Sequence, residues 1–430
     1  MPDSISNISP LLPPKISHDV DIIIVGGGMV GGAIACGLMD TGLSIALIER
    51  QLPPPFCAAS APDLRVSALN HGSEKLLREL QVWDAILAMR AQPYRRLAVW
   101  EKLPPVLDTL LPGQPNRTEF NAAEVGASHL GYIVENRIIQ LALQQRWQQA
   151  KNIRLVENLQ VQNLHFQAQA VEVELSDQQR LRAKLVIGAD GANSVVRKMA
   201  DLGLYSDSYD QHAMVLSVVA DGPAQDITWQ AFTPHGPLAF LPLWQHEDAT
   251  YASLVWYDAP ARLQALLALP EAELIHAVHK EFPKALPGLR SILGRGSFPL
   301  VKRHAQHYYR DRVVLVGDAA HTINPLAGQG VNLGFQDART LAEQIKKTLQ
   351  QPQFQHGQAQ LDQVDFLSAY ERQRRPANAR MMTLMDGFYY TFSNNLPPLK
   401  LLRNLGLGAA EHISPAKRQV LKYALGINAD

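Results

Sequence analysis

With 430 residues, 47% of them apolar and 19% charged, the chain has the length for two domains and the composition of a globular enzyme. Forty basic residues balance forty acidic ones, which excludes a global field that would favour nucleic acid or an acidic ligand. Two cysteines, Cys36 and Cys57, exclude a disulfide framework, and no Cys/His group has metal-ligand spacing, so we expect no metal and a reducing compartment such as the cytoplasm.

Residues 1–18 have neither the basic start nor the apolar stretch of a signal peptide, so we expect a disordered leader. The eighteen uncharged residues between Asp21 and Asp40 are as long as a membrane span. They include six glycines, however, and "DIIIV" is typical of a buried strand, while "VGGAIACGLMDTG" is typical of a helix closed by Gly42. The segment therefore predicts a strand, a turn and a helix.

The turn in this segment has the spacing Gly26-x-Gly28-x-x-Gly31. In a dinucleotide-binding turn, the first glycine permits the tight turn, the second lets a pyrophosphate approach the backbone, and the third lets helix and strand pack closely. The next strand, "LSIALIER", ends in Glu49, which is placed to accept hydrogen bonds from ribose hydroxyls. The pattern predicts adenine-dinucleotide binding and fits both NAD and FAD; the alternative is a tight turn without a ligand.

A second unit of strand, acidic turn and helix lies at residues 185–197, "LVIGADGANSVVR". Asp190 and Arg197 fall at the expected mouth of this unit. A capped turn between strand and helix explains the same pattern, so both interpretations stay open here.

The third unit lies at residues 313–338, where "RVVLV" is typical of a parallel strand. Asp318 follows at its carboxyl end, where ligands bind in open α/β sheets. The next helix opens at Gly328-Gln329-Gly330, whose backbone N–H groups suit a flat ring that becomes negative on reduction. This contact favours FAD; the alternative is a helix cap with loop glycines. The helix has an apolar face made of Val331, Phe335, Ala338, Leu341, Ala342 and Ile345.

Alternating strand and helix patterns predict an α/β fold, with a discontinuous, Rossmann-like FAD-binding domain, a mostly β substrate domain and a helical C-terminus. The expected ranges are 19–90, 130–204 and 304–364 for the FAD-binding domain, 91–129 and 205–303 for the substrate domain, and 365–430 for the C-terminal helical segment.

The segments "GGGMVG", "GADGANSVVR" and "GDAAHTINPLAGQGVNLG", in this order, carry a family resemblance. Over residues 19–427 the chain resembles FAD-dependent aromatic-ring monooxygenases of the para-hydroxybenzoate hydroxylase fold, and within them the hydroxylases of ubiquinone biosynthesis. A finer match, to the branch that acts on a demethoxyubiquinol-type ring, rests on "MRAQPYRRL" at 89–97, "WQAFTPHGPLAFLPL" at 229–243 and "SLVWYDAPAR" at 253–262.

The resemblance implies roles for individual residues in non-covalent FAD binding. The ADP half of FAD is expected on Gly26, Gly28, Gly31 and Glu49, and the ribityl chain on Asp318. The remaining expected contacts are Asp190 and Arg197 for FAD and the electron donor, Arg65 for the flavin, Arg137 on a helix beside the cofactor, and Pro325, Gly328, Gln329, Gly330, Val331 and Asn332 around the isoalloxazine.

The resemblance also implies the reaction. Reduced flavin and O₂ form a C4a-hydroperoxide, which hydroxylates a polyprenyl benzoquinol. Because no second glycine fingerprint follows a strand, NAD(P)H is expected as a transient donor. Candidate bases are His212, His235, His304 and Tyr257, and none is assigned.

Three other functions remain open: a sister hydroxylase acting at another ring carbon, a flavin dehydrogenase or reductase of the same fold, and an FAD-stabilised component of a biosynthetic complex. Residues 396–427 carry five basic residues against one acidic residue, interleaved with leucines. This pattern suits a membrane surface or a partner helix. The alternative is that the leucines pack on the FAD-binding domain.

Overall fold

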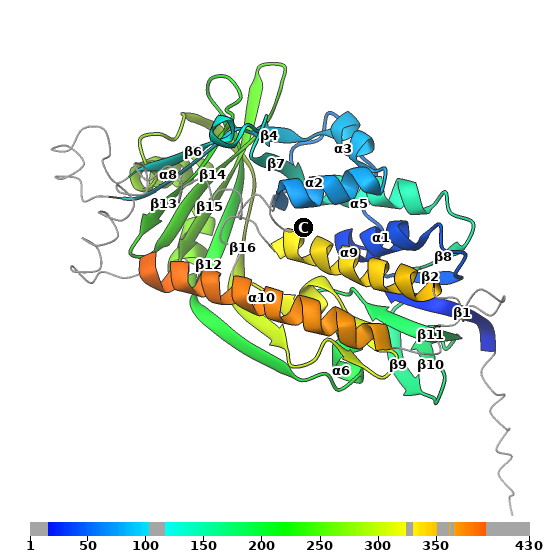
Figure 1. Cartoon of the computed structure of the whole chain (residues 1–430). Helices are drawn as coiled ribbons and strands as arrows, with labels where there is room; N and C mark the ends of the chain where they lie inside the picture. Colours follow the sequence, from blue (N-terminus) through cyan, green and yellow to red (C-terminus); the bar gives the residue numbers. More distant parts are fainter. Residues whose placement is uncertain (1–15, 103–116, 324–329, 351–360, 362–364, 393–430) are drawn as a thin grey trace, which may run out of the picture.

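The structure is a computed structural model that describes residues 16–102, 117–323, 330–350, 361 and 365–392 (Figure 1). Two large sheets lie side by side, a small third sheet lies between them, and helix α10 (Asp365–Phe392) runs along both parts of the molecule. Among the described helices, none has the length and apolarity needed to cross a membrane. The α/β fold class predicted from the sequence is confirmed.

The first sheet forms the cofactor side of the molecule. Its central parallel strands pair in register, with Ile22 beside both Leu185 and Ile45, and all three side chains are buried. Such a sheet, covered by helices, explains the continuous apolar run at residues 22–25. The strand order is β17 (Tyr309–Arg310), β18 (Val313–Leu315), β11 (Arg180–Gly188), β1 (Ile16–Val25), β2 (Ile45–Glu49) and β8 (Ile153–Glu157), with β10 (Val171–Leu175) and β9 (Val161–Phe166) attached to β11.

Helices pack on this sheet and on one another. Glycine makes the close approach of α1 and α9 possible: a Cβ on Gly334 would lie 2.6 Å from Val30 Cγ2, so the Val30 side chain of α1 packs directly on the backbone of α9. The helices on this side are α1 (Met29–Leu38), α2 (His71–Glu79), α3 (Trp83–Met89), α5 (Asn136–Trp147), α6 (Val195–Met199) and α9 (Gly330–Leu349).

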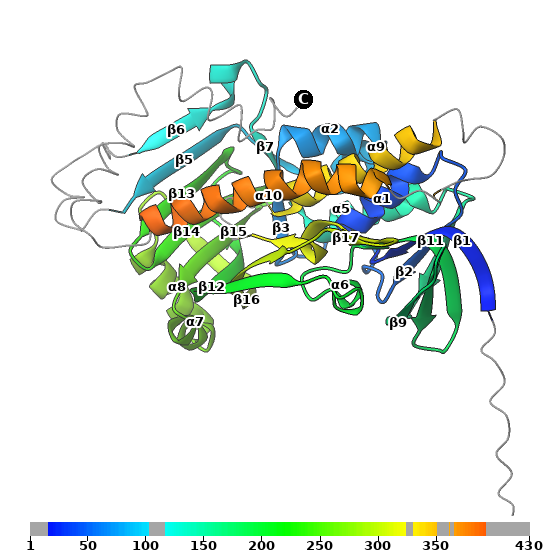
Figure 2. The same cartoon turned by 60° about the horizontal axis from the view of Figure 1, so that its bottom comes forward.

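The second sheet has its own apolar core, in which Met214 and Leu254 on the strands pack with Leu274 on a covering helix. The strand order is β19 (His321–Thr322), β16 (Leu289–Ala305), β12 (Leu204–Ala220), β15 (Ala249–Asp258), β14 (Gly236–His246), β13 (Ile227–Thr233), β5 (Arg96–Glu101) and β6 (Thr118–Asn121), with the short helix η1 (Ala122–Val125) after β6 and helices α7 (Pro260–Leu267) and α8 (Glu271–Glu281) on the core face. Figure 2 shows the long strands β12 and β16 reaching toward the first sheet.

The third sheet, in the order β3 (Val66–Leu69), β7 (Gly131–Glu135) and β4 (Gln92–Tyr94), connects the two parts. Ala68 and Ile133 from this sheet pack against Leu243 of β14. The cofactor side and the second sheet are thus joined by an apolar contact as well as by chain crossings.

The strands divide between the two large sheets as the predicted ranges do, although the domain boundaries themselves stay a prediction. One exception is β19, which falls in the range expected for the FAD-binding domain but pairs with β16. The leader prediction was three residues too long, because β1 begins at Ile16 and Ile16 pairs with Arg180 of β11. Backbone pairing with β11 extends β1 beyond its apolar residues. Residues 393–430 of the expected helical segment lie outside the described residues.

Candidate cofactor site

The glycine turn after β1 has the geometry that its spacing predicts. Gly26 has φ +101°, and a Cβ there would lie 2.4 Å from the carbonyl O of Ala189. A Cβ on Gly31 would lie 1.8 Å from the carbonyl O of Gly26, so both positions require glycine. At Gly28 the nearest atom to an added Cβ is Gln140 Nε2, at 3.6 Å. Gly28 thus leaves room for a phosphate at the N-terminus of α1.

Glu49 ends β2 beside this turn. Its Oε2 accepts a hydrogen bond from the Gly27 N–H at 2.7 Å, and its Oε1 accepts one from Gln51 N–H at 2.9 Å. A carboxylate has about four acceptor positions, so ribose hydroxyls can still donate to it. The hydrogen bond from Gly27 holds the Glu49 carboxylate, which is predicted to bind the ribose, against the glycine turn, which is predicted to bind the phosphates.

Asp190 follows β11 and caps the short helix α6. Its Oδ2 accepts hydrogen bonds from Val195 N–H at 2.7 Å and Val196 N–H at 3.2 Å. Its Oδ1 is buried and has no hydrogen-bond partner within the described residues. The capped turn that the sequence allowed is therefore present. The cap uses only Oδ2 of Asp190, so Oδ1 remains as a hydrogen-bond acceptor.

Arg197 lies in the interior, 3% exposed, rather than at the expected mouth. It donates hydrogen bonds to the carbonyl O of Ala319 at 2.7 Å and of Ala192 at 3.1 Å. Burial lowers the pKa of the Arg197 guanidinium, and nearby Asp190 opposes this. Arg197 thus connects the motif at residues 185–197 to the motif at residues 313–338. These contacts favour a role in positioning the two motifs.

Asp318 lies in the short helix η2 (Gly317–Ala319), directly after Gly317 with φ +57°. Solvent reaches the side chain, yet protein surrounds it closely enough that desolvation raises its pKa. His321 and Arg65 act in the opposite direction as nearby positive charges. The fold thus brings two residues predicted to contact FAD, Arg65 and Asp318, into the same electrostatic environment.

The segment containing Arg65 also lies where the second sheet meets the cofactor side. Ser217 Oγ on β12 donates to the carbonyl O of Pro62 at 3.4 Å, and a Cβ on Gly296 of β16 would lie 2.9 Å from Leu64. Arg65 is exposed directly beside this contact. Its position is therefore at the junction of the second sheet and the cofactor side.

At the start of α9, Asn332 is 1% exposed and anchors the helix to α2. Its Oδ1 accepts hydrogen bonds from Ser73 Oγ at 2.6 Å and Asn70 N–H at 3.2 Å, and its Nδ2 donates to the carbonyl O of Ala68 at 2.9 Å. Gly330 has open space around it among the described residues, and Val331 is partly exposed. The other residues predicted around the isoalloxazine lie outside the described residues: Pro325, Gly328 and Gln329.

Arg137, on α5, is engaged by the segment before β3. Its Nε donates to Asp63 Oδ2 at 2.8 Å, and a guanidinium N–H donates to the carbonyl O of Pro55 at 3.3 Å. The side chain is 14% exposed, so it is not a solvated helix charge. Its contacts hold the 55–63 segment near Arg65.

Sequence reasoning missed a buried polar group around Asp337 of α9, which is 0% exposed. Asp337 accepts hydrogen bonds from His321 at 2.5 Å, Arg374 at 2.7 Å and Asn378 at 3.0 Å, and from Gly317 N–H at 3.1 Å. Burial alone raises the pKa of Asp337, but His321 and Arg374 outweigh it and hold the pKa well below its usual range. The group fixes the turn that carries Asp318. The signal in the sequence was an acidic residue between the apolar positions of a buried helix.

The four candidate bases occupy different environments. Burial lowers the pKa of His304 to about 4, and its Nε2 lies 2.9 Å from Tyr308 Oη. Tyr257 is buried in an apolar cluster, which raises its pKa. His212 is partly buried on β12, and His235 is exposed. None of these side chains has a hydrogen bond to the glycine turn or to Asp318 within the described residues, and no base is assigned.

Comparisons with known proteins agree with this arrangement. A family model described as an FAD binding domain matches residues 19–384. The chain is 46% identical to 3-demethoxyubiquinol 3-hydroxylase of Escherichia coli (strain K12) over 96% of this chain and 100% of that protein. It is 34% identical to ubiquinone hydroxylase UbiL of Rhodospirillum rubrum, covering 94% of this chain and 89% of the relative. Among solved structures, p-nitrophenol 4-monooxygenase of Pseudomonas putida matches with a TM-score of 0.74 at 19% identity, over 95% of this chain and 99% of that one.

The FAD binding domain and the two full-length relatives together define an FAD-dependent monooxygenase. More narrowly, the chain belongs to the family of FAD-dependent hydroxylases of ubiquinone biosynthesis. FAD is therefore its cofactor. The open approach at Gly28, the carboxylate of Glu49 and the solvent-reached carboxylate of Asp318 suit the phosphates and hydroxyls of FAD.

Proposed function

We propose that this chain hydroxylates the ring of a demethoxyubiquinol-type polyprenyl benzoquinol, with O₂ as the oxygen source and NAD(P)H as the transient electron donor. The observation that carries the proposal is the 46% identity over the full length of the 3-demethoxyubiquinol 3-hydroxylase. The ubiquinone hydroxylase UbiL and the mitochondrial monooxygenase COQ6 of Xenopus tropicalis are both 34% identical to the chain. A sister hydroxylase acting at another ring carbon is the second candidate.

In this proposal, bound FAD supplies the redox and oxygen chemistry, and the protein supplies binding, orientation and exclusion of water. Gly26, Gly28 and Gly31 shape the phosphate turn, and Glu49 holds the ribose. Asp318 binds the ribityl chain, with its turn fixed by the buried carboxylate of Asp337.

The residues around the flavin ring have two kinds of role in the proposal. Arg65 faces the ring from the junction of the two sheets. Gly330 and Val331 border the ring, while Asn332 and Arg137 position the backbone on either side through their hydrogen bonds. Arg197 holds the second and third motifs together.

The substrate side of the proposal rests on the face of the second sheet that meets the cofactor side. Ser217 and Ser253 are direct neighbours on β12 and β15, so their side chains lie on the same face. Ser217 contacts Pro62, and Ser253 Oγ is buried without a hydrogen-bond partner among the described residues. An unpartnered hydroxyl near this junction is a candidate partner for a ring oxygen of the quinol.

Delivery of a substrate with a lipid tail to the enzyme is part of the proposal. We assign it to residues 396–427, which lie outside the described residues and whose charge and leucine pattern suits contact with an anionic membrane surface or with a partner in a biosynthetic complex. The enzyme would then work in the cytoplasm, at the inner membrane.

Lipid analysis of a strain that lacks the gene tests the ring position. Accumulation of the demethoxy quinone, restored to normal by the gene in trans, is the expected result. Accumulation of an intermediate that lacks a different ring hydroxyl would transfer the assignment to the sister hydroxylase.

Labelled oxygen separates the hydroxylase from the remaining alternatives. Purified protein supplied with ¹⁸O₂, NAD(P)H and a short-tail quinol is expected to place one labelled atom in the product. Turnover without label would indicate a dehydrogenase or reductase. Bound flavin that neither NAD(P)H nor the quinol can reduce or reoxidise would indicate an assembly component.

A further inference from the structure

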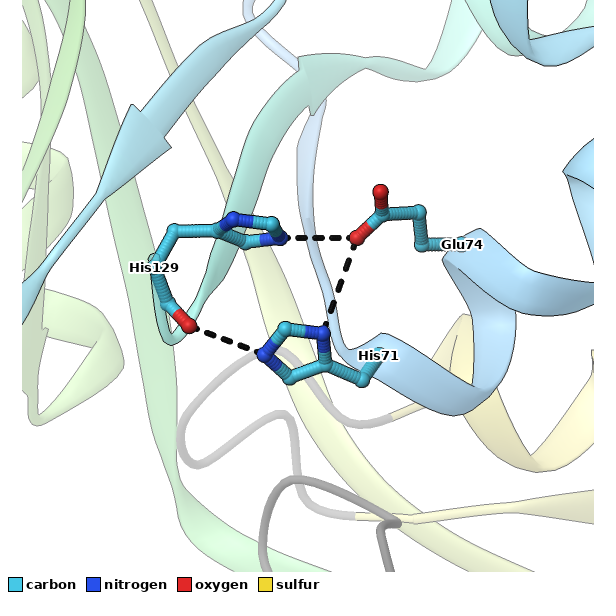
Figure 3. Close-up of side chains that lie close together, drawn as sticks. All are labelled: His71, Glu74 and His129. Carbon is cyan, nitrogen blue, oxygen red and sulfur yellow. Dashed lines mark hydrogen bonds and ion pairs between the residues drawn. The ribbon is translucent and has the colours of Figure 1, made fainter. Parts of the chain in front are cut away.

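Three side chains outside the cofactor site converge on one point (Figure 3). His71 and Glu74 lie one turn apart on α2, and His129 precedes β7. One potential ligand atom from each lies within 4.8 Å of the other two. Because His71 and His129 are 58 residues apart in the sequence, no spacing motif reveals the group.

The hydrogen bonds of His71 fix where its lone pair lies. Its Nε2 is 2.8 Å from the backbone carbonyl O of His129 and must donate, because a carbonyl only accepts. In neutral His71 the lone pair is therefore on Nδ1, which faces Glu74 Oε2 at 3.7 Å. A lone pair and a carboxylate oxygen repel one another unless a positive charge lies between them. The arrangement calls for a positive charge at this point, which either a proton on Nδ1 or a metal ion supplies.

His129 faces the same oxygen from the other side. Its Nε2 lies 2.7 Å from Glu74 Oε2, and its Nδ1 lies 2.8 Å from Ser128 Oγ. Because a serine hydroxyl both donates and accepts, Ser128 satisfies Nδ1 whichever ring nitrogen carries the proton. Nε2 is thus able to exchange its hydrogen bond for a bond to a metal, with the second ring nitrogen held by an outer partner.

Glu74 is held in place as a charged ligand. Its Oε1 accepts a hydrogen bond from Arg78 at 2.7 Å, which leaves Oε2 directed at the two imidazoles. Burial raises the pKa of Glu74, but His129 and Arg78 outweigh it and the pKa lies below its usual value. The Glu74 side chain is 8% exposed and that of His71 is 23% exposed, so an ion can enter from the His71 side.

We propose that His71 Nδ1, Glu74 Oε2 and His129 Nε2 bind one divalent transition-metal ion, with Zn²⁺ as the first candidate and water at the remaining position. Two imidazole nitrogens and one carboxylate oxygen are a ligand set that Zn²⁺ takes, at about 2.0–2.2 Å. Small side-chain movements bring the three atoms to these distances.

Such an ion would stabilise the end of α2 that contacts α9. Asn70, the residue before His71, donates its N–H to Asn332 Oδ1 at the start of α9. An ion that fixes His71 would therefore also stabilise the hydrogen bond between Asn70 and Asn332, which positions the start of α9. The inference depends on neither the ring position that is hydroxylated nor the identity of the substrate.

Zinc titration of the full-length, FAD-loaded protein, after dialysis against a chelator and then against chelator-free buffer, tests the proposal. Calorimetry is expected to give one Zn²⁺ per chain, with a higher thermal midpoint. His71→Gln removes a direct ligand and is expected to weaken zinc binding by at least about 100-fold, the upper end of what losing an outer partner costs. The matched control is His165→Gln, since His165 pairs with Glu174 at 3.1 Å without a third ligand in the described part of the chain. This control should bind Zn²⁺ like the parent.

X-ray absorption of the parent protein with one equivalent of Zn²⁺ keeps the test decisive even if His71→Gln does not fold. Two imidazole ligands and one oxygen ligand at about 2.0–2.2 Å are expected. Failure of the parent to bind a stoichiometric ion, equal affinity in His71→Gln, or a spectrum without imidazole scattering would each overturn the proposal and leave a cluster that binds only protons.

Discussion

At the scale of single residues, two carboxylates in one segment have opposite tasks. Asp318 is open to solvent and is available to a ligand, whereas Asp337 is buried and satisfied by protein donors. These tasks follow from the positions of the two residues, since Asp318 lies in the short helix η2 that follows β18 and Asp337 faces inward from α9. The charge of Asp318 is available to bind the cofactor, and the charge of Asp337 stabilises the fold.

Replacing Asp318 tests its assignment to FAD. Asp318→Ala is expected to raise the dissociation constant for FAD at least about tenfold, a loss of about 1.4 kcal/mol, because it removes hydrogen-bond acceptors for the ribityl chain. Flavin absorbance after desalting, followed by titration of the apoprotein, measures the effect. Asp84→Ala, on the exposed side of α3, is the control and should retain FAD. Stoichiometric flavin in Asp318→Ala would remove this residue from the site.

Replacing Asp337 tests the buried group. Asp337→Asn is expected to cost about 3–5 kcal/mol of unfolding free energy, because it leaves His321 and Arg374 without their anionic partner. Asp201→Asn, at an exposed pair with Arg310, is the control and should cost less than about 1 kcal/mol. Denaturant unfolding of both variants at pH 7 measures the difference.

The pH dependence of this effect has a definite sign. The pKa of Asp337 is lowered in the folded chain, so its contribution is present above the unfolded pKa of about 4 and is lost as pH falls through the folded pKa. The difference between parent and Asp337→Asn should therefore be constant from pH 7 down to about pH 4 and shrink only below it. A difference that disappears by pH 5 would show that another group is responsible.

At the scale of elements, the site depends on how closely α1 and α9 approach. Gly334 meets Val30 on α1, and Gly317 beside it would place a Cβ 3.0 Å from the same valine. The first and third motifs thus contact each other through two glycines and one side chain. This close packing places Asp318 next to the phosphate turn.

A substitution and its rescue test this packing. Gly334→Ala is expected to cost about 1–3 kcal/mol through overpacking and to weaken FAD binding. The double variant Gly334→Ala with Val30→Ala should recover most of the loss, because it removes the methyl groups that the new Cβ meets. Gly387→Ala on α10, where an added Cβ meets no atom within 4 Å, is the control. Thermal midpoints and FAD affinity that do not recover in the double variant would contradict the mechanism.

At the scale of the whole molecule, the second sheet lies beside the cofactor side, and α10 joins both parts. Tyr209 on β12 and Lys302 on β16 both contact Asp386 of α10, and Arg374 on the same helix contacts Asp337. A single helix therefore connects the substrate side to the turn that carries Asp318. The segment that follows this helix in the sequence is the one we assign to membrane contact.

Charge removal in that segment tests the membrane role. Replacing Lys417, Arg418 and Lys422 with Gln is expected to lower turnover on a quinol in anionic vesicles, because each basic residue contributes about 1 kcal/mol at such a surface. Turnover on a short-tail quinol and the thermal midpoint should not change. Raised salt should reproduce the loss in the parent protein. Equal activity in both assays would leave the segment a packing element.

The sequence by itself predicted the α/β class and the glycine turn from local patterns, and it predicted FAD from a family resemblance carried by three separate motifs. Gly31 is required by a contact inside the turn itself, with the carbonyl O of Gly26, and strand and helix periodicity reports local burial. The contact that requires glycine at Gly26 comes from Ala189, which only the tertiary structure brings near. Only the tertiary structure decided the roles of Arg197, Asn332 and Asp337, because their partners come from segments that are distant in the sequence. The same holds for the cluster of His71, Glu74 and His129, since packing of α2 against the loop before β7 brings its members together.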